Sequence, residues 1–127
     1  MTEPELSVVL TDDAHIQILN AQWRDEDKAT DVLSFPLYEP FQIPKDAPAI
    51  GDIVISIEYA EQTCEDAVHL KRMEESMGES IPKWELLEEI TFLLIHGLLH
   101  LVGHDHETKD EEQEMKMMEI KLWKALN

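Results

Sequence analysis

The sequence has little cysteine and no long apolar run. Its single cysteine, Cys64, cannot form an internal disulfide, and a free thiol is typical of a reducing compartment, so we expect a cytoplasmic protein. The longest nearly apolar run, residues 90–102, is interrupted by His96 and His100 and is too short to cross a bilayer. The N-terminus also lacks the basic region that begins a signal peptide. We therefore expect no association with a membrane.

Positive charge is also scarce. The chain has 10 Lys and Arg residues against 28 Asp and Glu residues, which gives a net charge of −18. Such a charge repels phosphate backbones and anionic lipids, so a role with nucleic acid has to overcome this repulsion. Most of the acidic residues fit solvated helix faces. The alternative explanation is that they bind a basic protein partner.

The length and the low glycine content indicate one compact domain over residues 1–127, since the chain has 127 residues and only 4 glycines. Strand-like patterns occur at residues 6–10, 31–38 and 51–57, and the last is the clearest because it is rich in β-branched residues. Prolines recur between the second and third of these patterns and predict an extended surface loop: Pro36, Pro40, Pro44 and Pro48.

Helical patterns fill most of the remaining chain. The first begins at Thr11 or Asp12 and ends near residues 24–27, the second covers residues 58–77 and stops at Gly78, and the third covers residues 84–102. Thr108 and Glu111 form a capping box that begins the last helix. We expect these apolar side chains to point inward: Ile16, Ile18, Leu19 and Trp23 in the first helix; Ala60, Cys64, Ala67 and Val68 in the second; Met115, Met118, Leu122 and Leu126 in the last.

The order of elements, βαββααα, predicts an α+β fold. We expect a small mixed sheet of three to four strands packed against helices. The helix at residues 84–102 is apolar on nearly all sides and should be central, because an exposed helix would have a polar face.

Two histidines on this central helix point to a metal site. His96 and His100 are four residues apart, so their side chains are separated by only about 40° around the helix axis and can meet at one point. HxxxH alone is a weak motif. In an apolar helix, however, an imidazole without a partner costs free energy, so each ring needs a metal or a hydrogen bond. A hydrogen-bonded core histidine remains the alternative for either residue alone.

A third histidine, His106, completes the predicted site. Gly103 breaks the helix and lets the chain turn back, which brings His106 toward the other two. His104 is the competing candidate, but on a continued helix it would lie about 12 Å along the axis from His96. Three neutral nitrogens with one open position are typical of catalytic zinc, which lowers the pKa of bound water and polarises phosphoryl or carbonyl oxygens.

The spacing of the run HGLLHLVGHDH also matches the metzincin signature HExxHxxGxxH. In that signature the Glu acts as a general base beside the zinc, and here Gly97 occupies its position. Glycine has no side-chain proton acceptor. The spacing therefore supports a metal, and the absent Glu argues against ordinary peptide hydrolysis.

Through this histidine-rich run, the sequence resembles the YbeY family of bacterial rRNA maturation endoribonucleases. That family has the signature HGxLHLxGYDH, an Asn, an aromatic residue and an Arg ahead of a strand motif, and the strand motifs TDVLSFP and GDIVIS. The matching positions here are residues 96–106, Asn20, Trp23, Arg24, Thr30–Pro36 and Gly51–Ser56. Two departures stand out: His104 replaces the usual Tyr, and the family usually has an additional N-terminal strand and helix before the segment that begins here near Leu6.

The resemblance implies a zinc-dependent, single-strand-specific endoribonuclease that acts in ribosomal RNA maturation and ribosome quality control. One Zn²⁺ per chain would be held by His96, His100 and His106, and Arg24 and His96 would be the catalytic residues. Arg24 would bind RNA phosphate, because a guanidinium makes paired hydrogen bonds to it and offsets developing charge. The implied partners are single-stranded and ribosomal RNA and the ribosome or a basic ribosomal protein, and no oligomeric state is predicted.

Several alternatives stay open. Arg24 could instead be an exposed arginine at a helix end that pairs with Asp25 or Glu26. Ser34 and Asp105 could support the site, although a strand serine and a turn aspartate are more often structural. We expect His15 and His69 to be surface residues without a role. The rival functions are a metallopeptidase or another zinc hydrolase, and a non-catalytic ribosome-assembly factor with structural zinc.

Overall fold

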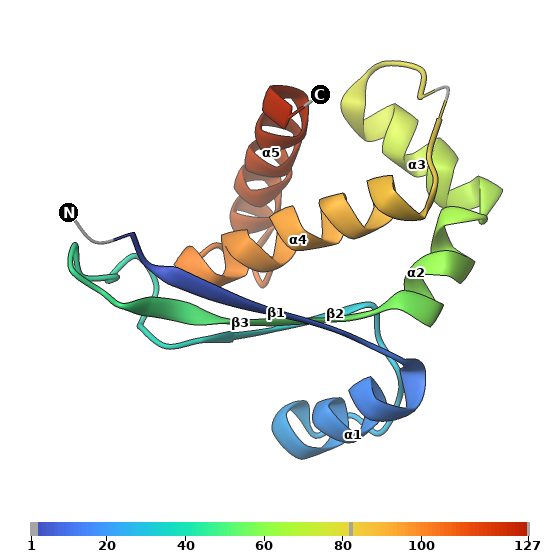
Figure 1. The fold of residues 1–127 in the computed structure, drawn as a ribbon. Helices are drawn as coiled ribbons and strands as arrows, with labels where there is room; N and C mark the ends of the chain where they lie inside the picture. Colours follow the sequence, from blue (N-terminus) through green and yellow to red (C-terminus); the bar gives the residue numbers. More distant parts are fainter. Residues whose placement is uncertain (1–2, 82, 127) are drawn as a thin grey trace.

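The computed structural model describes residues 3–81 and 83–126, and its helices lie on both sides of a small sheet (Figure 1). The predicted α+β class is confirmed, and the described part of the sheet has three strands. The elements in chain order are β1 (Glu5–Thr11), α1 (Asp13–Arg24), β2 (Val32–Pro36), β3 (Ala49–Ser56), α2 (Ile57–Cys64), α3 (Ala67–Met77), α4 (Leu86–Val102) and α5 (Lys109–Leu126).

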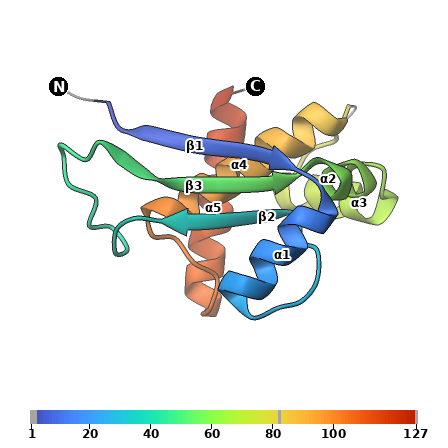
Figure 2. The same ribbon diagram turned by 60° about the horizontal axis from the view of Figure 1, so that its bottom comes forward.

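The sheet is mixed, with β3 in the middle. β1 pairs with β3 in parallel and β2 pairs with it antiparallel, so the order is β1-β3-β2 (Figure 2). Ile53 of β3 lies opposite Val8 on one side and Ser34 on the other. It is fully buried, as expected for a β-branched residue in a strand covered on both faces. Residues 37–48, which contain the predicted proline-rich loop, contain no helix or strand.

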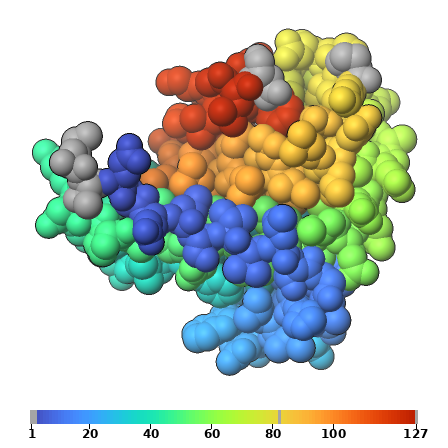
Figure 3. All heavy atoms as spheres, viewed as in Figure 1, coloured from blue at the N-terminus to red at the C-terminus, as the bar shows by residue number. Residues whose placement is uncertain are grey.

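The two faces of the sheet are covered by different helices. α4 packs on one face, where the buried residues are Ile50, Ile53, Ile55, Ala60, Leu93 and Leu101. α1 lies on the opposite face, where Ile16 packs with Leu33 and Val54 (Figure 1). In the space-filling view β1 lies at the surface and α1 projects from the rest of the molecule (Figure 3).

The side of α4 that faces away from the sheet is covered in turn by α3 and α5. The buried residues here are Met73, Met77, Trp84, Ile95, Leu99, Met115 and Trp123. α4 is therefore the central helix, as predicted from its apolar composition. No helix among the described residues is long and apolar enough to cross a membrane. The predicted capping box of α5 is present, with reciprocal hydrogen bonds of 3.2 Å between Thr108 and Glu111.

The single helix predicted at residues 58–77 is wrong, because the chain forms two helices there, α2 and α3. The carboxylate of Asp66 accepts hydrogen bonds from the backbone amides of Val68 and His69 and starts α3 as its N-cap. The break turns the α3 residues away from the face that a continuous helix would bury. Ala67 and Val68 are exposed as a result, whereas Ala60 is buried as predicted.

Three other apolar side chains predicted to point inward are exposed. In α1, Ile16 and Leu19 pack on the sheet, but Ile18 and Trp23 are 62% and 63% exposed. Positions 16 and 19 share one helix face, and Ile18 points away from it. Leu126 is also exposed, at the end of α5. Single exposed apolar residues are common on protein surfaces.

His69 differs from the prediction that it is an ordinary surface residue. Its Nε2 lies 2.8 Å from Oε1 of Glu89, and Trp84 Nε1 donates to the same oxygen at 3.0 Å. Glu89 is only 2% exposed, and a buried carboxylate requires such partners. The hydrogen bond to Glu89 raises the pKa of His69 above its ordinary value of 6.5, against the opposing effect of burial. This contact fastens α3 to α4.

The raised pKa of His69 predicts a pH-dependent contribution to stability. Stability from the charged pair is fully present below the unfolded pKa of 6.5 and is lost as the pH rises through the higher folded pKa. We expect the free energy of unfolding to fall more between about pH 6 and about pH 9 in the wild type than in His69→Gln. Denaturant unfolding of both proteins across this range measures the difference. Parallel pH profiles would contradict the pairing.

Candidate metal centre

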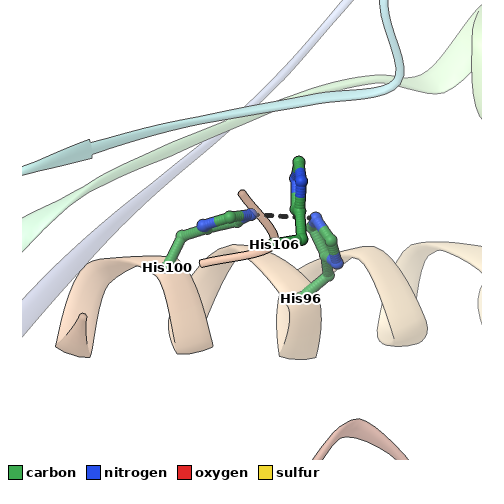
Figure 4. A group of neighbouring side chains, drawn as sticks. All are labelled: His96, His100 and His106. Carbon is green, nitrogen blue, oxygen red and sulfur yellow. Dashed lines mark hydrogen bonds between the residues drawn. The ribbon is translucent and has the colours of Figure 1, made fainter. Parts of the chain in front are cut away.

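The structure brings three histidine side chains together. His96 and His100 extend from α4, and His106 comes from the loop that follows it (Figure 4). One nitrogen from each ring can be chosen so that all three lie within 4.8 Å of one another. The Nε2 atoms of His96 and His100 are 3.1 Å apart. His96 and His100 are half-buried and His106 is exposed, so the cluster opens to solvent on the His106 side.

The position of α4 depends on Gly97, which lies between the first two histidines. A Cβ atom at this position would come within 3.0 Å and 3.1 Å of the Ile53 side chain and within 3.2 Å of Ser34 Oγ. Ser34 Oγ also donates a hydrogen bond to the Gly97 carbonyl at 3.2 Å. The absence of a side chain therefore lets α4 lie close against β2 and β3. A Glu at position 97, as in the metzincin signature, would require Ile53 or Ser34 to shift.

The turn that redirects the chain after α4 is built on Gly103. Its φ is +128°, and a Cβ atom would lie 2.7 Å from Phe41 N and 2.8 Å from Pro40 Cα. Only glycine tolerates both the backbone conformation and this close approach. Asp105 Oδ1 then accepts a hydrogen bond from the His106 amide at 2.8 Å and shapes the segment that carries His106.

His104 does not take part in the cluster. Its backbone amide donates to the Leu99 carbonyl at 2.9 Å, which still belongs to the helix end. Its ring packs edge-on against Phe41, with ring centroids 5.1 Å apart. The structure thus brings His106 to the other two histidines and directs His104 to the preceding loop, which is the arrangement expected from the sequence.

The histidines suit a divalent metal in charge as well as in position. The pKa of His100 is lowered from 6.5 to about 4, mainly by burial and to a smaller extent by the neighbouring His96 and His106. This ring is therefore neutral near pH 7, and the lone pair on one of its nitrogens can bind a metal. Tetrahedral zinc with ligands at about 2.0–2.1 Å requires nitrogens about 3.3 Å apart, close to the observed separation of the two Nε2 atoms. The residues present fit such an ion.

Arg24 lies at the end of α1 and is exposed. Its Nη2 donates a hydrogen bond to the Ser34 carbonyl at 3.3 Å. Among the described residues Arg24 forms no ion pair, and Glu26 lies near Lys28 instead, at 3.8 Å. Since Ser34 Oγ is bonded to Gly97, a single buried serine connects Arg24 to the helix turn that carries His96. Ser34 thus has a structural role at the site.

The sequence analysis missed Glu119. This residue is buried in α5, and its Oε1 lies 3.3 Å from His96 Nδ1. Glu119 and His96 also line a cavity of about 280 Å³ whose walls include Met73, Met77 and Met115. A signal was available, because position 119 follows Met115 by four residues and therefore lies on the predicted apolar face of the helix.

The remaining histidines lie apart from the cluster. His15 is exposed and pairs with Asp12 at the start of α1, as expected for a surface residue. His69 contacts Glu89, as described above. Neither belongs to the group of ligand atoms formed by His96, His100 and His106.

Comparison with known proteins gives consistent matches. The profile of the family described as "Endoribonuclease YbeY" matches residues 1–127. The chain is 42% identical over 124 residues to Endoribonuclease YbeY of Agrobacterium fabrum, which covers 96% of this chain and 64% of that protein. It is 42% identical over 127 residues to Endoribonuclease YbeY of Nautilia profundicola, which covers 100% of this chain and 76% of that protein. The chain thus spans less than two thirds of the length of the Agrobacterium relative.

One solved structure also resembles the chain. It is the solution structure of TM1509 from Thermotoga maritima, with a TM-score of 0.45 and 26% sequence identity. The match covers 98% of this chain and 71% of that one.

The different positions of His104 and His106 lead to opposite expectations for two alanine variants. His106→Ala should lose stoichiometric zinc, because it removes one of three clustered nitrogens. His104→Ala should keep the zinc, because its ring packs on Phe41. Competitive zinc titration of both variants and the wild type measures this difference. Loss of zinc in His104→Ala with retention in His106→Ala would reverse the assignment.

Proposed function

This chain belongs to the YbeY family of endoribonucleases, and from that premise we propose that it cleaves single-stranded RNA at a zinc centre formed by His96, His100 and His106. The observation that carries the proposal is that these three side chains converge on one point at the surface. Ser34 links the helix turn of His96 to Arg24 through two hydrogen bonds. We further propose that residues 1–127 act as one domain, since α4 contacts β2 and β3, which precede it in the chain, and α5, which follows it.

The histidines supply three nitrogen ligands and leave a side open to solvent. A zinc ion bound there would act as a Lewis acid toward a phosphoryl oxygen and would lower the pKa of a water molecule to near neutrality. His96 and His100 are held by α4, so their separation is set by the helix itself. His106 is the exposed member of the set, which leaves room for a polymer to approach from its side.

Arg24 is assigned to the substrate phosphate. A guanidinium has five N–H donors, and within the described residues Arg24 uses one hydrogen bond to Ser34. The remaining donors can hold two phosphate oxygens in parallel and offset charge that develops during cleavage. The bond from Nη2 to the Ser34 carbonyl holds one end of the guanidinium beside the strand residue that is bonded to Gly97.

The arrangement favours RNA cleavage over peptide hydrolysis. Metallopeptidases of the HExxH type use a helix Glu as general base, and here that position is Gly97, which has no side chain and is tightly packed against Ile53 and Ser34. Arg24 adds a positive group that suits a phosphodiester, whose phosphate is negatively charged before the reaction begins. We therefore place peptide hydrolysis second.

The net charge of −18 bears on the partner. Free RNA is repelled by such a protein at a distance, so the proposed substrate, ribosomal RNA, is best reached when the protein is already attached to the ribosome or to a basic ribosomal protein. We propose that the activity serves ribosomal RNA maturation and ribosome quality control in the cytoplasm. The rival proposal is an assembly factor in which the metal only supports the fold.

The zinc-loaded chain should cleave single-stranded RNA and leave duplex RNA and casein intact. A chelator should abolish the cleavage, and zinc should restore it, because the metal supplies the Lewis acid. Incubation of the protein with each substrate, with and without chelator, measures this. Cleavage of casein would favour the peptidase, and zinc binding without any cleavage would favour the assembly factor.

Arg24→Ala should lose RNA cleavage by roughly 10²-fold or more, the usual cost of removing a group that stabilises developing charge. Its zinc content should be unchanged, because Arg24 is not among the clustered ligands. Arg72→Ala removes an exposed arginine on α3 and serves as the control for the charge change. Single-turnover cleavage rates together with metal analysis give the comparison. Equal rates for Arg24→Ala and Arg72→Ala would remove Arg24 from the mechanism.

A further inference from the structure

Glu119 is an unusual residue within α5. The helix has many acidic side chains, and those in its first two turns include Asp110, Glu112 and Glu114, all exposed. Glu119 is 8% exposed and faces α4. Burying a carboxylate costs free energy unless hydrogen bonds compensate. The partner that the structure provides is Nδ1 of His96, 3.3 Å from Oε1.

This contact determines which nitrogen of His96 carries the proton. A neutral imidazole has one N–H and one lone pair, and a carboxylate can only accept a hydrogen bond. In a neutral ring that hydrogen-bonds to this carboxylate, the proton is on Nδ1 and the lone pair is on Nε2. Nε2 is the atom that lies 3.1 Å from His100 Nε2, at the point where the histidines meet.

We propose that Glu119 is a positioning residue that holds His96 in the Nδ1–H tautomer and so directs the Nε2 lone pair at the metal. The inference builds on the proposed function, since it assumes that the three histidines bind a metal. Carboxylates that accept from the second nitrogen of a ligating histidine fix both its tautomer and its ring orientation. Helix α5, which carries Glu119 23 residues after His96, thereby contributes to the site.

The geometry assigns Glu119 this role and not that of a ligand or a general base. Its contact is with Nδ1, whereas the histidines approach one another through Nε2 atoms on the other side of the ring. Glu119 is also not part of the group of ligand atoms. The surrounding cavity wall includes Met73, Met77 and Met115, and such apolar surroundings strengthen a hydrogen bond between the two polar groups.

Two variants of Glu119 and one control separate this role from a purely structural one. Glu119→Met removes the acceptor, and a side chain of similar length suits the methionine-lined cavity. Glu119→Gln retains an acceptor oxygen without the charge. Glu114→Met makes the same substitution at an exposed position of the same helix. Circular dichroism and thermal unfolding of the metal-free proteins establish that each variant is folded.

The first readout is the tautomer of His96, observed by long-range ¹H–¹⁵N correlation in the metal-free protein. The wild type and Glu114→Met should show His96 protonated at Nδ1, and Glu119→Met should show a shift toward the Nε2–H form. The second readout is zinc affinity by competition with a chromophoric chelator. Glu119→Met should bind zinc roughly 10- to 100-fold more weakly, the usual cost of losing such a partner. Glu119→Gln should recover most of this loss.

A Glu119→Met protein that keeps the wild-type tautomer and zinc affinity would overturn the proposal. Equal loss of zinc affinity in Glu119→Gln and Glu119→Met would also overturn it, because the retained acceptor would then have no effect. Neither readout uses RNA. If the tautomer and zinc affinity change as expected but the wild type cleaves no RNA, the proposed function fails and the role of Glu119 stands.

Discussion

The site depends above all on the close packing of α4 against the sheet at Gly97. Ile53, fully buried in the middle strand, lies so close to this helix turn that a Cβ atom at position 97 would come within 3.0 Å of its side chain. His96 and Gly97 are consecutive, so a side chain at position 97 would require Ile53 or Ser34 to shift directly beside the site. Ser34 reinforces the packing through its bond to the Gly97 carbonyl. Since protein interiors are close-packed, this contact helps to fix the position of α4, which also packs against β3, α2 and α5.

Around that contact, segments that are distant in sequence form the rest of the site. Ser34, on the edge strand β2, accepts a hydrogen bond from Arg24 at the end of α1. The loop around Pro40 and Phe41 packs on Gly103, so it shapes the turn that brings His106 back. Glu119 reaches His96 from α5. Each of these contacts involves a backbone group or a buried polar atom. A buried polar group without a hydrogen-bond partner costs free energy, so the geometry of these contacts is restricted.

The pattern of the sequence predicted the type and order of most elements. Period-two and β-branched segments became strands, and the apolar helix became central because its composition leaves no polar face to expose. The break at Asp66 was missed, since a helix pattern runs through it and only the local hydrogen bonds of its carboxylate stop the helix. The exposure of Ile18 and Trp23 was missed because an apolar residue type does not tell which side of a helix meets the sheet.

The sequence by itself determined the candidate ligands, because helix periodicity relates His96 to His100 and a glycine after the helix permits the return of His106. It also indicated Arg24 through a family motif. Only the tertiary structure decided that Ser34 joins Arg24 to α4, that His104 turns to Phe41, and that Glu119 meets His96. The physical reason is range: local periodicity fixes side chains a turn apart, whereas contacts between separate elements depend on how those elements pack.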